Sequence, residues 1–224
     1  GNAAMMHYHA TPEDHAVLEK KGFLLVDSGA TYMDGTTDIT RTYPLGPLTE
    51  DEKRFYTWTL QSHIDLAKAV WLDYCECKMI DTIAREPLWR HLINYRCGTG
   101  HSVSFVGNVH EGPHALNSRN TTRMRPGMVV TDEPGVYETD LVGIRIENEL
   151  VCVHKADNQY GTFLGFEPLM FVPIATSPIL PGVLDKDEIA WLNDYHRQVF
   201  AKLAPHLNDE ERSWLAEKCA AIGC

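Results

Sequence analysis

The segment Gly22-Phe23-Leu24-Leu25-Val26-Asp27-Ser28-Gly29 gives the first indication of the fold class. It is an apolar run that begins at a glycine and ends in a turn that contains an aspartate. Such a run predicts a buried β-strand that leads into a turn. Residues 36–43 follow, are rich in threonine, and predict a second strand. Side chains alternate along a strand, so Asp38 and Thr40 share one of its faces. The short spacing between Asp27 and Asp38 favours an antiparallel hairpin.

Helical segments separate this hairpin from later strands. Thr49-Glu50-Asp51-Glu52 is a capping box and predicts a helix that continues to about Cys75, and residues 79–95 predict a second helix interrupted by Pro87. Further strands are expected at residues 103–109, 127–133 and 143–153, and terminal helices at residues 185–203 and 209–221. Strands, then helices, then strands with hairpin spacing again predict an α+β domain.

The composition narrows the class of protein. The chain has 224 residues, of which 44% are hydrophobic and 23% charged, which suits one large domain or one domain with an extension. The formal net charge of −11 argues against nucleic acid and anionic membranes as partners. The sequence contains no run of 18 apolar residues, so it predicts no transmembrane helix. Six cysteines without a C-x-x-C pair favour reduced thiols in a cytoplasmic protein.

Four carboxylates and one histidine lie at strand ends or just inside strands, namely Asp27, Asp38, His101, Glu133 and Glu147. An ionised carboxylate in an apolar strand is costly unless it is paired or bound to metal. Each of these residues alone is more often a solvated strand end, but two on each hairpin can converge on two cations. A donor set of oxygens with one nitrogen suits manganese, cobalt, iron or zinc.

Six short motifs carry a resemblance to a known family. They are Leu25-Val26-Asp27-Ser28-Gly29-Ala30, Thr37-Asp38-Ile39-Thr40-Arg41-Thr42, Gly98-Thr99-Gly100-His101, Asn108-Val109-His110-Glu111-Gly112-Pro113, Thr131-Asp132-Glu133-Pro134-Gly135 and Gly143-Ile144-Arg145-Ile146-Glu147-Asn148. These motifs resemble the pita-bread metallopeptidases, which include methionine aminopeptidase, prolidase and aminopeptidase P. The Asp34-Gly35-Thr36-Thr37-Asp38 string and the tail from Phe166 to His196 are similar to the cytosolic, multi-domain aminopeptidase P type.

The resemblance implies a particular fold. It implies the α+β pita-bread fold, a curved antiparallel sheet with outer helices, here lacking its first part. Residues 1–165 would be an N-terminally truncated catalytic domain and residues 166–224 a C-terminal extension. Gly1 to His9 reads as the middle of a strand-like stretch, so we expect a fragment of a longer protein.

The resemblance also implies a role for each metal ligand. Asp27 would chelate one metal ion, Asp38 and Glu147 would bridge both, and His101 and Glu133 would hold the other. Glu133 would in addition pass a proton from the bridging water to the leaving proline nitrogen.

Two outer histidines, His7 and His110, match the family's histidines near the scissile bond. They would hydrogen-bond the substrate and stabilise the tetrahedral oxyanion. The implied activity is hydrolysis of the N-terminal Xaa-Pro peptide bond by a dinuclear metal-bound hydroxide. The implied cofactors are two divalent metal ions, with manganese preferred. The implied partners are a peptide with proline at its second position and, through the C-terminal extension, a second copy in a homodimer.

Two alternatives remain beside the aminopeptidase. One is prolidase, which acts on Xaa-Pro dipeptides, and the other is a non-catalytic module that keeps the fold. Cys97 stands where the family often has a histidine, and Ser102 and Ser104 stand where glycine is usual. Arg41 and Arg145 would neutralise the carboxylates, although an ordinary strand-face ion pair explains Arg145 equally well. The other histidines are expected in loops or on the surface, namely His9, His15, His63, His91, His114, His154, His196 and His206.

Overall fold

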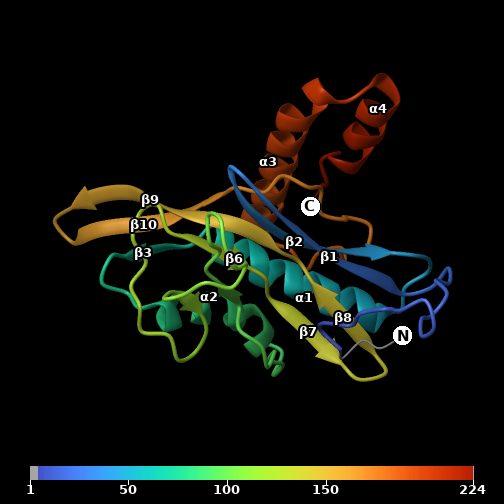
Figure 1. Cartoon of the computed structure of the whole chain (residues 1–224), viewed down its shortest axis with the longest axis horizontal. Helices are drawn as coiled ribbons and strands as arrows, with labels where there is room; N and C mark the ends of the chain where they lie inside the picture. Colours follow the sequence, from blue (N-terminus) through green and yellow to red (C-terminus); the bar gives the residue numbers. More distant parts are fainter. Residues whose placement is uncertain (1–4, 224) are drawn as a thin grey trace.

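The computed structural model describes residues 5–223 and contains strands, helices and then strands again, with a helical C-terminal region (Figure 1). In chain order the elements are β1 (Phe23–Tyr32), β2 (Gly35–Pro44), α1 (Glu50–Ala67), β3 (Val70–Leu72), α2 (Cys77–Trp89), β4 (Gly100–His101), β5 (Ala115–Leu116), β6 (Val129–Asp132), β7 (Gly135–Glu138), β8 (Val142–Arg145), β9 (Asn148–Asn158), β10 (Gly161–Pro168), α3 (Lys186–Leu203), the 3-10 turn η1 (Ala204–His206) and α4 (Asp209–Lys218). All the strand pairs are antiparallel, as the hairpin spacing predicted.

The β1–β2 hairpin places two of the predicted ligands on the same face. Asp27 lies opposite Thr40, and Gly29 lies opposite Asp38. A Cβ atom at position 29 would meet the carbonyl oxygen of Thr37 at 2.5 Å, so this close pairing requires glycine. The prediction that β1 is a buried strand is wrong, because most of its residues are exposed. Among the described strands it pairs only with β2, so one edge and one face of β1 stay uncovered.

The central sheet has the strand order β3-β10-β9-β6, and α1 and α2 pack against it. Apolar residues of α1, α2, β6, β9 and β10 form its core, with Leu66, Ile80, Val130 and Leu150 fully buried. The long β9–β10 hairpin extends away from the rest of the molecule (Figure 1). Helix α1 therefore lies behind the strands that carry the predicted ligands, and its inward residues can contact them.

Several predicted elements differ in the structure, among them the second helix, which begins at Cys77, runs through Pro87 and ends at Trp89. The first helix ends at Ala67, and Val70–Leu72 then pairs with β10 as strand β3. Residues 103–109 form a loop instead of a strand, and Phe105 is 69% exposed. The segment has neither a neighbouring strand to pair with nor an element packed over it among the described residues, so it does not form part of a sheet. Residues 5–9 also form no strand, and residues 1–4 of the predicted N-terminal stretch lie outside the described part.

The predicted strand at residues 143–153 is two strands, and the break has a consequence for the site. Strand β8 pairs with β7, whereas β9 pairs with β6 and β10. The chain changes partner at Ile146 and Glu147, where the Glu147 amide donates to the carbonyl oxygen of Thr40 at 3.1 Å. Glu147 is thus held at the junction of two small sheets and the β1–β2 hairpin.

The C-terminal helices begin where the sequence predicted. Asp185 caps α3 and Asn208 caps α4, each in a capping box with a glutamate three residues later. Helix α3 packs on α1 through Leu192, Tyr195 and Val199. The α3–α4 pair projects from the strands (Figure 1). None of the helices within residues 5–223 is both long enough and apolar enough for a membrane crossing.

A buried ion pair in α2 supports the segment that leads to His101. Arg85 donates to Asp81 at 2.7 Å and to the backbone carbonyls of Tyr95 and Cys97 at 2.9 and 2.8 Å. Asp81 in turn accepts from the Thr99 hydroxyl. We expect Arg85→Met to lower the free energy of unfolding by about 3 kcal/mol, because it leaves Asp81 buried without its cation.

Arg90→Met is the matched control in urea-unfolding experiments. Arg90 pairs with Glu86 four residues before it, also at 2.7 Å, but both side chains are largely exposed. Its loss should cost less than about 1 kcal/mol. Equal losses for the two variants would contradict the stabilising role assigned to burial of the Arg85 pair.

Candidate metal centre

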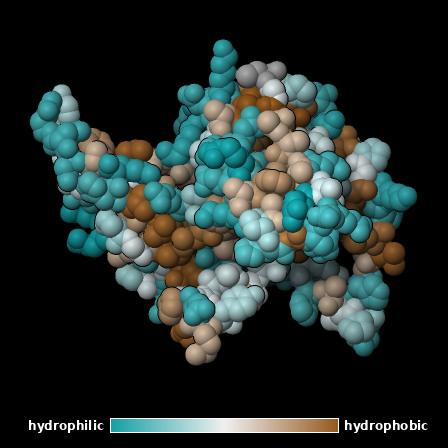
Figure 2. Space-filling model, turned by 90° about the horizontal axis from the view of Figure 1, so that it is seen from above, coloured by the Kyte–Doolittle hydropathy of each residue, from teal (hydrophilic) through white to brown (hydrophobic). Residues whose placement is uncertain are grey.

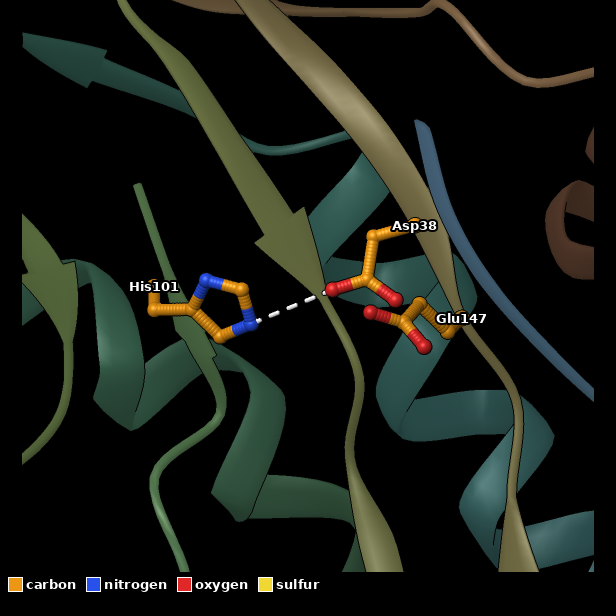
Figure 3. A group of neighbouring side chains, drawn as sticks. All are labelled: Asp38, His101 and Glu147. Carbon is orange, nitrogen blue, oxygen red and sulfur yellow. Dashed lines mark ion pairs between the residues drawn. The ribbon is translucent and has the colours of Figure 1, made fainter. Parts of the chain in front are cut away.

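Three of the five predicted ligands converge closely. Asp38 from β2, His101 from β4 and Glu147 from the β8–β9 junction each offer an atom, and these atoms lie within 4.8 Å of one another (Figure 3). His101 Nε2 lies 3.5 Å from Asp38 Oδ2. Asp38 and Glu147 are buried, and the imidazole is half-buried. The three strands therefore bring residues more than 100 positions apart into one donor cluster.

Glu133 joins the cluster directly after the end of β6. Its Oε1 lies 3.1 Å from His101 Nε2 and accepts from the Thr131 hydroxyl at 2.9 Å. A glycine is required nearby, because a Cβ at position 100 would lie 1.8 Å from the carbonyl oxygen of Thr131. The close packing of β4 on β6 thus depends on Gly100, and it sets the distance between His101 and Glu133.

Asp27 lies at the edge of the cluster and contacts Arg145. Arg145 Nη2 lies 2.5 Å from Asp27 Oδ2, and Arg145 Nε donates to the Thr40 hydroxyl at 2.9 Å. The Thr40 hydroxyl donates to Glu147 Oε2 at 2.6 Å. A buried guanidinium therefore contacts Asp27 directly and reaches Glu147 through the Thr40 hydroxyl.

The charges in this cluster disturb its protonation. Burial, followed by the charges of Glu133 and Asp38, raises the pKa of Glu147 well above its ordinary value. Burial by itself lowers the pKa of His101, but hydrogen bonds to Asp38 and Glu133 outweigh that effect and raise the pKa to about 10. Perturbation of this kind is typical of functional sites.

The donor set fits a pair of divalent cations. Glu147 Oε1 is buried and has no hydrogen-bond partner among the described residues. A buried carboxylate oxygen without a donor is costly, and a bound cation would remove that cost. The remaining donors, from Asp27, Asp38, His101 and Glu133, are carboxylates and one imidazole, a combination that suits first-row divalent metals.

The two outer histidines differ in placement. The ring of His110 lies 3.9 Å from the ring of His101, centroid to centroid, and its side chain is exposed. A substrate at the cluster could therefore reach His110. His7 is exposed, and within residues 5–223 the structure records no hydrogen bond or ring contact between His7 and the other predicted site residues.

Cys97, Ser102 and Ser104 lie within four residues of His101 in the chain. Cys97 is half-buried, and its Sγ lies 3.8 Å from the carbonyl oxygen of Gly135. Burial, followed by the Glu133 charge, raises the pKa of the Cys97 thiol, which keeps it protonated and weakly nucleophilic. Ser102 is buried, and the hydroxyls of Ser102 and Ser104 have no hydrogen-bond partner among the described residues.

Several buried polar residues beside the ligands were missed by sequence reasoning. We expected His63, His114 and His196 on the surface or in loops. This expectation is wrong for His63 and His196, which are fully buried in helices. His114 does lie in a loop, but its side chain is buried. For His63 a signal was available, because apolar residues at Leu60 and Ala67 put it on the inner face of α1. Burial also raises the pKa of Glu149, two residues after Glu147, to about 7.

Comparisons with known proteins identify the family of the chain. The profile described as "Metallopeptidase family M24" matches residues 1–154, and the profile described as "C-terminal region of peptidase_M24" matches residues 162–222. Aminopeptidase P2 of Arabidopsis thaliana is 42% identical over 221 residues, which cover 96% of this chain and 31% of that protein.

Solved structures extend the comparison to the fold. X-prolyl aminopeptidase from Caenorhabditis elegans, described as a cytosolic enzyme with a di-nuclear active site, matches with a TM-score of 0.92 and 37% identity, over 99% of this chain and 37% of that one. Prolidase from Pyrococcus furiosus matches with a TM-score of 0.62 and 28% identity, over 75% and 45% of the two chains.

These matches settle the family and the fold. The chain spans less than two fifths of the length of either aminopeptidase. Its fold is the predicted pita-bread fold, a curled antiparallel sheet with helices, of which this chain covers a part. Since the M24 profile covers more than half of the sequence, the chain belongs to metallopeptidase family M24.

Proposed function

We propose that this protein is a metal-dependent aminopeptidase that hydrolyses the N-terminal Xaa-Pro peptide bond. The observation that carries the proposal is the cluster of Asp38, His101 and Glu147, with Glu133 beside it, in a chain similar to aminopeptidases P. Two divalent ions in such a cluster would supply a nucleophile from water near neutral pH and would polarise the scissile carbonyl.

The protein's own residues have separate tasks in this proposal. Glu133, held by the Thr131 hydroxyl, accepts a proton from the attacking water and returns it to the proline nitrogen. His110, exposed beside His101, donates a hydrogen bond to the developing oxyanion. His7 is proposed as its partner on the substrate side. Asp27, oriented by Arg145, completes the ligand set.

A chemical property of the substrate supports a dedicated site for the Xaa-Pro bond. The Xaa-Pro bond has no N–H, so proteases that read the backbone by strand pairing lose a donor there. A site that binds the free amino group of the substrate and the proline ring does not need a backbone N–H donor at that bond. The similarity to aminopeptidase P supports the preference for proline, and the prolidase similarity keeps dipeptides as the alternative substrate class.

Cleavage assays test the activity. The full chain, loaded with manganese, is expected to release the first residue of Arg-Pro-Pro, and Glu133→Gln should reduce the rate by more than about 100-fold because the proton carrier is lost. Glu210→Gln, an exposed change on α4, is the control and should leave the rate unchanged. Preference for Gly-Pro over Arg-Pro-Pro would identify a prolidase. Full metal loading without cleavage of either would identify a non-catalytic module.

The remaining parts of the proposal concern setting and assembly. We propose manganese as the resident metal, a cytoplasmic location, a homodimer, and a division into a catalytic domain at residues 1–165 and a C-terminal extension at residues 166–224. The oxygen-rich donors support the metal. The C. elegans structure, described as cytosolic, supports the location. Metal analysis of the purified protein and its sedimentation behaviour test the first and third parts.

A further inference from the structure

Five buried polar side chains form a continuous network behind the proposed metal ligands. In spatial order they are Tyr195, Arg41, Asn148, His63 and Asp132, which come from α3, β2, β9, α1 and β6. All five are at most 3% exposed. We call them the back network. None of them is among the proposed ligands, so their convergence needs a separate explanation.

Arg41 is the hub of the back network, and its contacts are unusual for a buried cation. It donates to the Asn148 amide oxygen at 2.8 Å, to the Tyr195 hydroxyl at 2.9 Å and to the Thr40 carbonyl at 2.9 Å. It also donates to the backbone carbonyls of Glu147, Val172 and Pro173. Within residues 5–223 no carboxylate lies within ion-pair distance of it. Arg41 thus does not neutralise the cluster directly, and it instead fixes the backbone of Glu147 from behind.

Tyr195 links this hub to the C-terminal region. Its hydroxyl oxygen lies 3.2 Å from Asn148 Oδ1 and accepts from the Val172 amide at 3.2 Å. Its ring stacks on Trp191 at 5.4 Å, with an angle of 2° between the planes. Helix α3 and the segment before it therefore reach the residue that directly follows Glu147. Contacts from β2, α1 and α3 together hold the Asn148 side chain in one rotamer.

His63 carries the network on to the strand that precedes Glu133. Its Nε2 lies 3.3 Å from Asn148 Nδ2, so this nitrogen accepts and Nδ1 carries the proton. Nδ1 lies 3.1 Å from Asp132 Oδ2 and 3.2 Å from the Asp132 carbonyl oxygen. Asp132 and Asn148 are paired residues of β6 and β9. A single imidazole therefore connects the two strands whose neighbouring residues are Glu133 and Glu147.

The adjacency of these residues in the chain explains why they can position the ligands. Asp132 directly precedes Glu133 at the end of β6, and Asn148 directly follows Glu147 at the start of β9. His63 bonds to the Asp132 backbone carbonyl and Arg41 to the Glu147 backbone carbonyl, so these contacts fix the backbone from which the two glutamates project. Outer residues that orient ligands commonly change metal affinity 10- to 100-fold when they are removed.

We propose that the back network positions Glu133 and Glu147 for the metal pair, and that Tyr195 makes the C-terminal helix α3 part of this positioning. The inference rests on the proposed metallopeptidase function. It assigns to residues of the C-terminal region a role in metal binding, although none of them touches the metal cluster.

Tyr195→Phe, compared with Tyr56→Phe, tests the proposal. Both tyrosines are buried, and within residues 5–223 the Tyr56 hydroxyl donates to the Ala175 carbonyl at 2.7 Å and makes no hydrogen bond to the back network. Calorimetric titration of the metal-free full chain with Mn²⁺ is expected to show about tenfold weaker binding for Tyr195→Phe and wild-type binding for Tyr56→Phe. Tyr195→Phe should also lose more thermal stability than Tyr56→Phe, since the Tyr195 hydroxyl accepts from Arg41 and Val172 and donates a further bond, whereas the Tyr56 hydroxyl donates one.

His63 provides a second test, with rescue by a conservative variant. In His63→Asn the amide nitrogen can take the place of Nδ1 and still donate to Asp132, whereas His63→Leu cannot donate. Manganese affinity is expected to fall at least about tenfold in His63→Leu and to recover most of that loss in His63→Asn. Equal losses in both variants would show that His63 only fills space.

The outcomes separate the inference from the function on which it rests. If the wild-type chain binds no pair of Mn²⁺ ions, the proposed function fails. If it binds the pair, and Tyr195→Phe binds as tightly as Tyr56→Phe, the function stands and the positioning role of α3 is refuted. The electron paramagnetic resonance spectrum gives an independent readout, because misplaced carboxylates should convert the signal of coupled manganese ions into that of isolated ions.

Discussion

Glu147→Gln is expected to abolish tight binding of the metal pair and, at the same time, to stabilise the metal-free chain. Glu147 is the most buried ligand, and its Oε1 has no hydrogen-bond partner among the described residues. Loss of a residue that only orients a ligand costs up to about 100-fold in affinity, so loss of a proposed ligand should cost more. Peptidase activity should fall with the metal.

The gain in stability has a separate electrostatic cause. Burial and the charges of Glu133 and Asp38 raise the pKa of Glu147, which means that its charged form is unfavourable in the folded, metal-free protein. Glutamine keeps the shape, its oxygen can still accept from Thr40, and it carries no charge. Urea unfolding at pH 8 in the presence of a chelator should therefore show a higher midpoint for the variant.

Glu188→Gln is the matched control for this prediction. Glu188 is also buried and also has a pKa raised by burial, but it contacts Gln61 and the cap of α3. This variant should bind manganese like the wild type. A Glu147→Gln variant that keeps both metal ions, or one that unfolds more easily without metal, would contradict the assignment of Glu147 as a bridging ligand in an electrostatically strained site.

The sequence predicted the ligand cluster well where local rules determine geometry. Alternation along β2 and the antiparallel register put Asp27, Asp38 and Thr40 on one face, and the caps at Asp185 and Asn208 set the starts of two helices. These features depend on residues close in sequence. The family motifs then supplied the pita-bread fold, which local patterns alone do not specify.

The sequence did not predict features that depend on distant partners. Residues 143–153 read as one apolar strand, but the exchange of partners between β7 and β6 breaks it at Glu147. His63 and His196 read as surface residues because polar side chains usually are exposed, whereas here hydrogen bonds from other elements reach both ring nitrogens of His63 and Nε2 of His196. The back network could not be predicted from the sequence for the same reason, since each of its contacts joins elements that are far apart along the chain.

Metal affinity is expected to rise at least about 100-fold between pH 6 and pH 8. A histidine binds metal only as the neutral imidazole, and hydrogen bonds to Asp38 and Glu133 raise the pKa of metal-free His101 to about 10. Throughout this pH range the imidazole of His101 must lose its proton before it can bind the metal. The metal affinity should therefore rise about tenfold for each pH unit. The raised pKa of Glu147 steepens the dependence further. Titration calorimetry in two buffers of different ionisation enthalpy should show at least one proton released per metal pair.

The same protons give the metal-free chain the opposite dependence on pH. A folded-state pKa above the unfolded value stabilises the fold below the unfolded pKa, and this stabilisation is lost as pH rises through the folded pKa. Burial raises the pKa of Glu149 to about 7, and His101 titrates near 10, so both reduce stability as pH rises from 6.5 to 8. His196, whose pKa burial lowers to about 4, opposes this trend only slightly, because its unfolded imidazole loses only about half a proton between pH 6.5 and pH 8.

Thermal unfolding of chelated and manganese-loaded protein at pH 6.5 and pH 8 measures both effects together. The midpoint of the chelated chain should fall with rising pH, and the gain from manganese should grow, because bound metal stabilises by an amount that increases with its affinity. A stabilisation by manganese that is equal at the two pH values would mean that no proton is displaced from His101. In that case either the imidazole is not a ligand or its hydrogen bonds to Asp38 and Glu133 do not hold a proton in the metal-free protein.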